Sequence, residues 1–201
     1  MPATPSYDAI VLAGGEGSRL GGVDKAQLDL AGSPLIARPL AACADAERVV
    51  IVGPENLRQL AGRVTVTRED PPGGGPAAGT AAGLAQLGRG GAEWIILLSC
   101  DLPRAEAGVR RLLDAAHQDH EAADGYCLTD SEGRLQWLFG GYRRDALLRA
   151  VEECAQPAGT SMRRLLRTLR LTAIPTTDEI SGDLDTWEDH AAWTARLENT
   201  P

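Results

Sequence analysis

The residues best suited to chemistry lie in a glycine-rich stretch from Leu12 to Lys25, which reads LAGGEGSRLGGVDK. Its five glycines let the backbone bend tightly and approach a chain of phosphates closely. Arg19 and Lys25 add positive charge, the arginine as a planar fork for phosphate and the lysine as a mobile point charge. This composition predicts a binding site for a phosphorylated ligand.

The glycine-rich stretch does not match two common phosphate-binding motifs. The P-loop order G-x-x-x-x-G-K-[ST] does not fit, and the dinucleotide fingerprint G-x-G-x-x-G begins at Gly15 but meets Leu20 where its third glycine should stand. A flexible surface loop is the remaining alternative. It is disfavoured because the glycines and both cations directly follow the apolar segment Tyr7–Leu12, which predicts a buried strand.

Acidic residues form a second group of candidates. Asp101 lies two residues after Trp94–Ser99, the most apolar segment of the chain, and a carboxylate is costly to bury there without a partner or a metal. Its alternative role is the N-cap of a helix that starts near Pro103. Asp183 and Asp185 lie close together near the C-terminus, where an acidic helix start is the alternative to a functional role.

These residues need a scaffold, and the sequence predicts alternating strands and helices. We expect strands at Tyr7–Leu12, Arg48–Val52, Val64–Thr67, Trp94–Ser99, Asp124–Leu128 and Leu138–Tyr142. We expect helices from Ser33 and Pro34 to about Ala44, and at Ala77–Leu87, Glu106–His120, Thr160–Leu169 and Thr186–Leu197. The alternation favours a three-layer α/β/α fold with a mostly parallel sheet, whose ligands bind at the carboxyl ends of the strands. The glycine-rich stretch and Asp101 should therefore converge on one cleft.

Composition sets further limits. With 201 residues, 43% of them hydrophobic, we expect one domain over 1–201, with a flexible N-terminus at 1–6. The formal net charge of −8 argues against nucleic acid as a partner. No signal peptide and no apolar run near ~20 residues is visible, which argues against a membrane partner. Four separated cysteines suggest buried thiols in a reducing cytosol, and hence a cytoplasmic protein.

The stretch from Leu12 to Lys25 resembles L-A-G-G-x-x-S-R-L-G-x-x-D-K, the signature of the MobA-like NTP transferases, typified by molybdenum cofactor guanylyltransferase. The resemblance implies a Rossmann-like, GT-A-like fold of the nucleotide-diphospho-sugar transferases. It also implies roles within the stretch: backbone contacts to the nucleotide from Leu12, Ala13, Gly14 and Gly15, and neutralisation of the triphosphate by Arg19 and Lys25.

Segments after the second and third expected strands extend the resemblance toward the base. Asp70, followed by Gly75, Pro76 and Gly79, resembles an acidic residue and a G-P-x-x-G element that contact base and ribose in the family. Rigidity of the loop alone is the alternative. Gly53 stands near the position of an asparagine that the family's guanylyltransferases usually carry near the base, and it can offer only backbone groups.

Two acidic segments resemble the family's metal site. Ser99–Pro103 matches a strand-end D-x-P, whose aspartate, here Asp101, binds Mg²⁺. Asp183–Asp189 resembles N-x-N-T-P-E-E/D, although aspartates replace both asparagines and tryptophan replaces proline. The resemblance thus implies Asp101 as the principal Mg²⁺ ligand, with Asp185 or Asp183 closing the site.

Two further segments bear on the acceptor. Gln136–Tyr142 resembles the family's Q-P-L-x-x-x-Y strand, which implies a role in shaping the acceptor pocket, and core packing is the alternative. Arg163, Arg167 and Arg170 are expected on one face of the helix from Thr160, as a solvated basic face. Contact with an acceptor phosphate is the alternative for these arginines.

The resemblance implies a Mg²⁺-dependent nucleotidyltransferase. It would transfer NMP from an NTP, with GTP favoured, to a phosphorylated acceptor, with molybdopterin favoured, and release pyrophosphate. One alternative is a cytidylyltransferase or sugar-phosphate nucleotidyltransferase of the same fold. Another is a nucleotide-binding regulator without turnover, against which the presence of Arg19, Lys25 and Asp101 argues. We expect a monomer or weak homo-oligomer.

Overall fold

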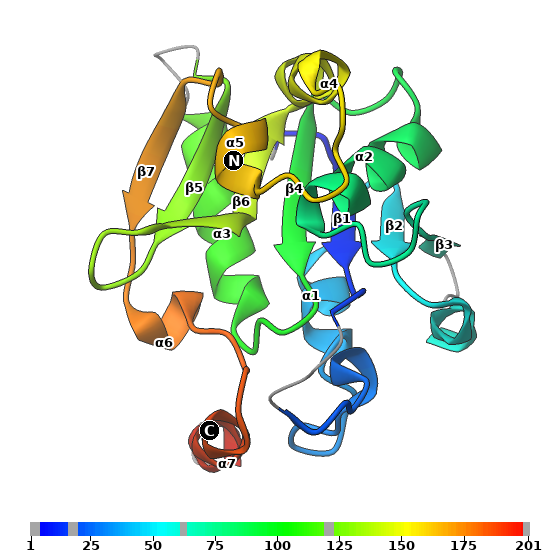
Figure 1. Cartoon of the computed structure of the whole chain (residues 1–201). Coiled ribbons are helices and arrows are strands. Elements are labelled where there is room, and N and C mark those ends of the chain that lie inside the picture. The colour runs from blue at the N-terminus through cyan, green and yellow to red at the C-terminus, as the bar shows by residue number, and fades with distance from the viewer. Residues whose placement is uncertain (1–4, 16–19, 61–63, 119–122, 199–201) are drawn as a thin grey trace.

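A seven-stranded sheet, in the order β3-β2-β1-β4-β6-β5-β7, forms the centre of the protein (Figure 1). The computed structural model describes residues 5–15, 20–60, 64–118 and 123–198. The strands are β1 (Tyr7–Leu12), β2 (Val49–Val52), β3 (Val64–Thr67), β4 (Trp94–Ser99), β5 (Gly125–Thr129), β6 (Leu135–Arg143) and β7 (Leu171–Pro175). Of these strands, β6 alone opposes its neighbours, so the expected mostly parallel sheet is confirmed.

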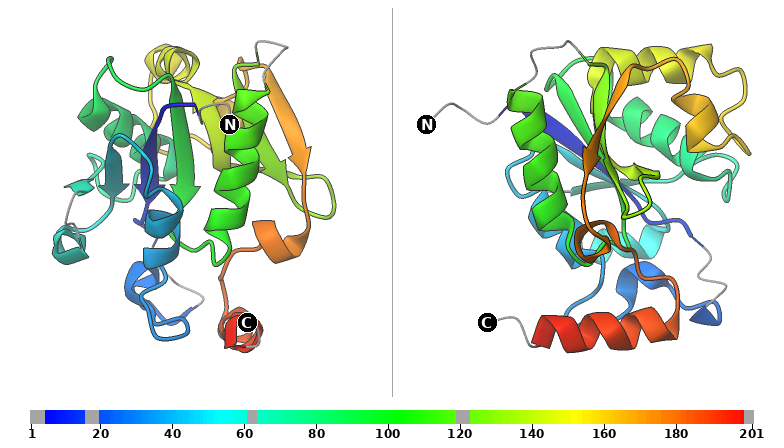
Figure 2. Two further views of the ribbon diagram at one scale, coloured as in Figure 1. Left: turned by 180° about the vertical axis from the view of Figure 1, so that it is seen from behind. Right: turned by 90° about the vertical axis from the view of Figure 1, so that its left-hand side faces the viewer.

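Helices cover both faces of the sheet, as the two views of Figure 2 show. The face with α1 (Ala37–Ala42) and α3 (Ala105–His117) is opposite the face with α2 (Pro76–Leu87), α4 (Arg144–Glu153) and α5 (Met162–Leu165). Shorter elements are η2 (Lys25–Gln27), η3 (Glu55–Leu60) and α6 (Asp178–Ser181), and α7 (Trp187–Glu198) ends the described chain. In Figure 1, α7 lies below the ends of the central strands, on the side of the β1 and β4 carboxyl ends.

The apolar sequence of β4 follows from its place between the two helical layers. Ile96 and Leu98 join one core cluster with α3, while Ile95 and Leu97 join the other cluster with α2. Successive side chains of a strand point to opposite faces, so a strand covered on both faces must be apolar at every position. This burial fixes the register that brings Ser99, and with it Asp101 two residues later, to the sheet edge.

Helix α2 lies close to β1 because its contact face is built from small residues. A Cβ added at Gly83 would lie 2.7 Å from Cγ2 of Ile10, closer than packed carbon atoms come. At Gly79 the same construction gives 3.2 Å to Cδ2 of Leu12. Pro76 begins the helix, at a position where its missing N–H has no intrahelical partner to lose. The start of α2 is thereby held beside the carboxyl end of β1.

Two of the expected helices differ from the structure. The helix expected from Ser33 begins only after Ile36, because Pro34 pairs with Asp29 in a β-bridge. Helix α5 ends at Leu165, so the expected arginine face is wrong: Arg163 lies on the helix, whereas Arg167 and Arg170 follow it. The backbone N–H of Arg170 instead donates to the carboxylate of Asp124 at 2.9 Å, where the chain enters β7.

The cysteines are free thiols. Cys43, Cys100 and Cys127 are buried as expected, whereas Cys154 is only half-buried. Burial raises the pKa of Cys127 to about 11 and that of Cys43 to about 12, so both thiols stay protonated near neutral pH. Across the described ranges, no helix combines the length and the apolarity needed to cross a membrane.

Candidate active site

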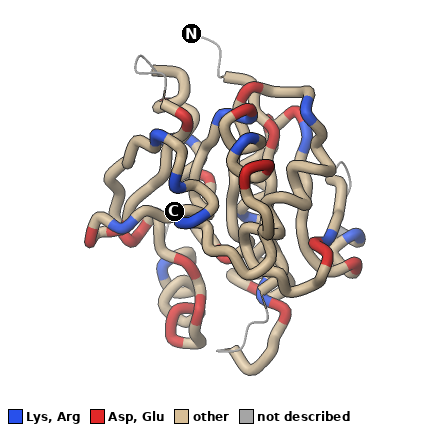
Figure 3. Tube along the Cα trace, turned by 45° about the horizontal axis from the view of Figure 1, so that its top comes forward, with Lys and Arg blue, Asp and Glu red and all other residues tan. Residues whose placement is uncertain are grey.

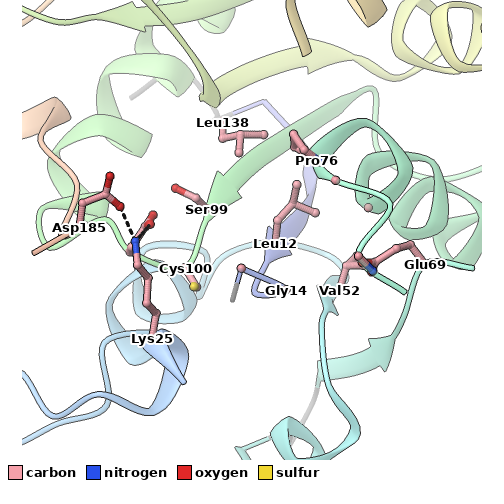
Figure 4. Close-up of a pocket in the computed structure, with 15 residues that line it drawn as sticks. Leu12, Gly14, Lys25, Val52, Glu69, Pro76, Ser99, Cys100, Leu138 and Asp185 are labelled. Atoms are coloured by element: carbon pink, nitrogen blue, oxygen red, sulfur yellow. Dashed lines mark hydrogen bonds and ion pairs between the residues drawn. The ribbon is translucent and has the colours of Figure 1, made fainter. Parts of the chain in front are cut away.

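A cavity of about 600 Å³ opens at the carboxyl ends of β1 and β4 (Figure 4). Most of the predicted site residues line it: Leu12, Gly14, Gly15, Lys25, Gly75, Pro76, Gly79, Asp101 and Asp185. They come from segments far apart in the chain, and the parallel strands bring them together because their carboxyl ends share one edge of the sheet. The convergence predicted for the glycine-rich stretch and Asp101 is confirmed.

Lys25 is held at one end of the cavity by the short helix η2. Asp24 caps this helix, with its Oδ1 accepting a hydrogen bond from the N–H of Ala26 at 3.1 Å. Ala26 is buried, and its carbonyl accepts from the N–H of Ile36 at 3.1 Å. These contacts fix the backbone of Lys25, so that its side chain reaches from η2 toward the end of β4.

The C-terminal acidic segment is attached to Asp101 through the backbone. The N–H of Leu184 donates to the carbonyl of Asp101 at 3.0 Å, and the Leu184 side chain is fully buried beside Leu20 and Trp193. Asp183 and Asp185, on either side of Leu184, are therefore placed next to the Asp101 carboxylate. Residues separated by some eighty positions in the sequence thus form one acidic cluster.

The start of α7 fixes the other side of this cluster. Thr186 Oγ1 accepts from the N–H of Asp189 at 3.1 Å, and Asp189 Oδ2 accepts from the N–H of Thr186 at 2.8 Å. Thr186 and Asp189 therefore form a capping box at the start of α7. Asp189 Oδ2 also accepts from the N–H of Asp185 at 3.1 Å, so the cap directly orients an acidic residue of the site.

Lys25 lies between two carboxylates of the cluster. Its Nζ donates to Asp101 Oδ2 at 3.2 Å and to Asp185 Oδ1, and a dashed line in Figure 4 joins Lys25 to the labelled Asp185. Burial lowers the pKa of Lys25, but its hydrogen bonds to Asp185 and Asp101 and their charges outweigh this, and the pKa is raised. The ammonium therefore stays charged at neutral pH.

The carboxylates of Asp101, Asp183 and Asp185 each place an oxygen within 4.8 Å of the others. The pKa of Asp183 is raised, mainly because its carboxyl is desolvated and to a smaller extent because Asp101 and Asp185 repel its charge.

Acidic and basic residues are interspersed along the chain in the view of Figure 3. The charge available to a ligand at this site is therefore set by the local cluster rather than by the net charge of the protein.

The N-cap role considered for Asp101 is wrong. Helix α3 begins at Ala105, and Arg104 occupies the N-cap position. The Asp101 carboxylate points instead toward Lys25. The side chain of Asp101 therefore caps no helix and instead pairs with Lys25, which lines the same cavity.

At the other end of the cavity, the structure brings in a residue that the sequence reasoning missed. Glu69 lines the cavity and is buried, whereas its predicted neighbour Asp70 is exposed and is not among the described lining residues. The sequence offers two adjacent carboxylates there and no pattern that chooses between them. The base-contact role of Asp70 stays a prediction.

Gly53 and Ala13 are next in the chain to the lining residues Val52 and Gly14 but do not belong to the described lining themselves. A Cβ at Gly53 would lie 3.0 Å from the carbonyl oxygen of Ala13 and from Cδ1 of Leu57, so a side chain there would push the loop outward. The N–H of Ala13 donates to the carbonyl of Val52 at 2.7 Å. Both residues therefore support the backbone after β1. Arg19 lies outside the described residues.

A second cavity, of about 670 Å³, adjoins the first and shares Pro76, Ser99, Asp101 and Leu138 with it. Its other lining residues include Gln136, Trp137 and Phe139 of the segment expected to shape an acceptor pocket, together with Arg163 and Asp183. Tyr142 of that segment is buried in the core instead, and its hydroxyl donates to the carbonyl of Trp137 at 2.7 Å. Asp101 thus stands at the boundary of two cavities.

Comparison with known proteins identifies relatives along most of the chain. The family model of the MobA-like NTP transferase domain matches residues 9–174. A protein of Nostoc sp. named "Probable molybdenum cofactor guanylyltransferase" is 33% identical over 192 residues, covering 91% of this chain and 88% of that protein. A molybdenum cofactor guanylyltransferase of Pseudomonas putida is 32% identical over 177 residues, covering 83% of this chain and 85% of its own length.

Solved structures share the architecture. Molybdopterin-guanine dinucleotide biosynthesis protein A from Archaeoglobus fulgidus has a TM-score of 0.73 at 19% identity, covering 96% of this chain and 100% of that one. The inositol-1-phosphate CTP transferase from T. maritima has a TM-score of 0.70 at 15% identity, covering 99% of each chain. These likenesses confirm the expected Rossmann-like fold. Together with the family model and the curated relatives, they show that this chain belongs to the MobA-like NTP transferase family and is a nucleotidyltransferase.

Proposed function

We propose that this protein transfers GMP from GTP to a phosphorylated acceptor of the molybdopterin type, in the cytoplasm, with release of pyrophosphate. The names of the Nostoc and Pseudomonas relatives support the donor and the acceptor. The structural observation that carries the proposal is the junction at Asp101, which borders both cavities, with Lys25 and Asp185 lining the first cavity and Asp183 lining the second. A donor in the first cavity and an acceptor in the second would meet there.

The acidic cluster fits a Mg²⁺ ion. Mg²⁺ prefers oxygen ligands and is commonly held by one or two protein carboxylates, with phosphates and water completing its shell. Asp101 is well placed as the principal ligand, and Asp185 or Asp183 can supply the second oxygen. When bound, Mg²⁺ would supply charge neutralisation on the phosphates as the transition state forms.

The residues of the chain supply positioning and charge. The backbone of Gly14 and Gly15 borders the first cavity and lets the triphosphate approach closely. Lys25 Nζ neutralises phosphate oxygens, with Arg19 as the second cation by resemblance. An acceptor phosphate oxygen attacks the α-phosphorus in line, and the bond to the departing pyrophosphate breaks. Catalysis then comes from orientation and preorganised charge, with the nucleophile supplied by the acceptor itself.

A pyrophosphate-release assay with each of the four common NTPs, with and without a molybdopterin acceptor, tests this function. We expect release that requires GTP, Mg²⁺ and the acceptor together. Titration calorimetry in the presence of Mg²⁺ should rank GTP as the tightest-bound NTP. Much tighter binding of CTP than of GTP would show that the donor is misassigned.

Replacing Lys25 with methionine should have opposite effects on the two ligands. Affinity for Mg²⁺–GTP should fall roughly tenfold or more, because a charge-assisted contact to phosphate is lost. Affinity of the nucleotide-free protein for a divalent cation should rise, because the ammonium that pairs with Asp101 and Asp185 no longer competes for their oxygens. Calorimetry measures the first effect, and the free Mn²⁺ signal in electron paramagnetic resonance measures the second.

Lys25 is the one lysine of the sequence, which gives this prediction a direct control. Protein labelled with ¹³Cε-lysine should give a single lysine signal, which should shift when Mg²⁺–GTP is added. Lys25→Arg keeps the charge but replaces a compact ammonium by a planar guanidinium, so it separates charge from fit. Unchanged GTP affinity in folded Lys25→Met protein would show that the ammonium does not contact the triphosphate.

A further inference from the structure

Glu69 lies at the end of the first cavity away from Lys25 (Figure 4). Only 8% of the residue is exposed, although it carries a carboxylate. Its Oε1 accepts a hydrogen bond from the N–H of Gly73 at 3.0 Å. A Cβ added to Gly14 would lie 3.6 Å from Oε1 and 4.0 Å from Oε2, so both oxygens border the space beside the backbone after β1.

The hydrogen-bonding capacity of this carboxylate is only partly used. An ionised carboxylate can accept about four hydrogen bonds, and burying one is costly unless donors replace the lost water. Across the described ranges, Glu69 accepts the one bond from Gly73 and forms no ion pair. A carboxylate that is buried in a cavity wall and keeps free acceptor sites is suited to a ligand with neighbouring N–H donors.

The position of Glu69 indicates which part of a nucleotide it would meet. If the triphosphate lies against Lys25 and Asp101, the base must extend toward the opposite end of the cavity. The apolar side chains of Leu12 and Val52 line the route and can contact the faces of a base. Glu69 then stands at an edge of the base, beyond these apolar walls.

We propose that Glu69 is the residue that selects guanine, by accepting hydrogen bonds from the N1–H and the N2 amino group of the base. The inference rests on the proposed function, since it requires the nucleotide to occupy the first cavity. Guanine presents these two donors side by side, which matches the two oxygens of a carboxylate. Cytosine and adenine each place a ring-nitrogen acceptor beside their amino group, and uracil has one N–H between two carbonyls. A carboxylate repels those acceptors.

Glu69 is better suited to contact the base than Gly53 or Asp70, the two other candidates. Gly53 has no side chain, and its N–H is already donated to the carbonyl of Thr67 at 2.9 Å. Asp70 is exposed, so water competes for its hydrogen bonds. The buried carboxylate of Glu69 acts where water is excluded, and unpaired acceptors facing it cost the most there.

The variant Glu69→Gln tests this assignment, because it should shift the nucleotide preference of the protein from GTP toward XTP. The glutamine oxygen can still accept from Gly73, so the local fold should persist, while its NH₂ group faces the guanine donors. GTP affinity should fall roughly tenfold or more. Affinity for XTP should rise, because the glutamine NH₂ can donate to the 2-oxygen of xanthine while its oxygen accepts from N1–H. Equilibrium calorimetry with Mg²⁺ and each NTP, without acceptor, gives these affinities.

Two controls keep the outcome specific. Asp70→Asn alters the exposed neighbour, and a switch from GTP to XTP in this variant instead of in Glu69→Gln would assign base selection to Asp70. The wild-type protein should bind GTP roughly tenfold or more tightly than ITP, which lacks the 2-amino group, and this comparison needs no variant. Equal wild-type affinity for GTP and ITP, or an unchanged GTP preference in Glu69→Gln, would overturn the role of Glu69. A wild-type preference for CTP or ATP would instead overturn the proposed donor.

Discussion

Replacing Asp101 with asparagine should reduce Mg²⁺-dependent turnover by about 10³-fold while the protein stays folded. Loss of a ligand that holds a catalytic metal removes several kcal/mol of transition-state stabilisation, and each ~1.4 kcal/mol corresponds to a factor of ten in rate. The structure indicates that this loss of turnover should not be accompanied by a loss of stability. Asp101 caps no helix, and Lys25 keeps Asp185 as a partner after the change. Removing one of three crowded carboxylates also relieves repulsion.

The assay compares turnover at saturating GTP over a range of Mg²⁺ concentrations, alongside thermal melts. Asp114→Asn, on an exposed position of α3, is the matched control and should behave as wild type. Asp183→Asn and Asp185→Asn, measured separately, identify the second ligand. If both are silent, Asp101 is the sole protein ligand. Wild-type turnover and Mg²⁺ dependence in folded Asp101→Asn protein would rule out the metal assignment.

The part of the site that sequence analysis predicted depends on local order and strand direction. The segment from Leu12 to Lys25 carries its residues in a fixed order along the chain, and Asp101 lies two residues after the end of the most apolar strand. Once the sheet is mostly parallel, the ends of β1 and β4 must meet. The acidic cluster depends in addition on the contact between Leu184 and Asp101, which only tertiary packing supplies.

The parts that the sequence did not predict depend on orientation or on weak patterns. Whether Glu69 or Asp70 faces the cavity is set by the backbone path after β3, and two adjacent acidic residues carry no periodicity that reports it. Strand β7 lies at the sheet edge, and all five of its positions are half-buried or exposed, so the sequence gives only a weak sign of a buried strand there. The segment from Leu166 to Arg170 continues an amphipathic pattern that suggests helix, but the chain turns there to enter β7.

Asp8 and Arg144 form a buried ion pair that no sequence pattern predicted. Asp8 is fully buried in β1, and its Oδ2 accepts from Nη2 of Arg144 and, at 2.6 Å, from Nη2 of Arg48. Arg144 is 4% exposed and also donates to the carbonyls of Ala92 at 2.7 Å and Gly88 at 3.0 Å. The Asp8 carboxylate thus joins β1 to Arg144 at the start of α4, and Arg144 in turn binds the connection between α2 and β4.

Replacing Asp8 with asparagine should lower the free energy of unfolding by about 3–5 kcal/mol, because it leaves the Arg144 guanidinium buried without a counter-charge. For a chain of this length, that corresponds to a fall in melting temperature of roughly 6–20 °C. Asp8 lies toward the end of β1 remote from the cavity, so GTP affinity of the folded variant should be unchanged. Urea and thermal denaturation measure stability, and calorimetry below the transition measures binding.

An exposed ion pair supplies the comparison that isolates burial as the cause. Arg89 and Glu152 pair with side chains 80% and 48% exposed, so Glu152→Gln should cost less than about 1 kcal/mol. A double variant, Asp8→Leu with Arg144→Met, removes both charges and should recover much of the stability lost in Asp8→Asn, since apolar residues of similar size often replace a buried pair at little cost. Arg48 can remain, because its side chain is 42% exposed and keeps access to water. If Asp8→Asn costs no more than Glu152→Gln, the buried pair does not stabilise the junction of β1 and α4.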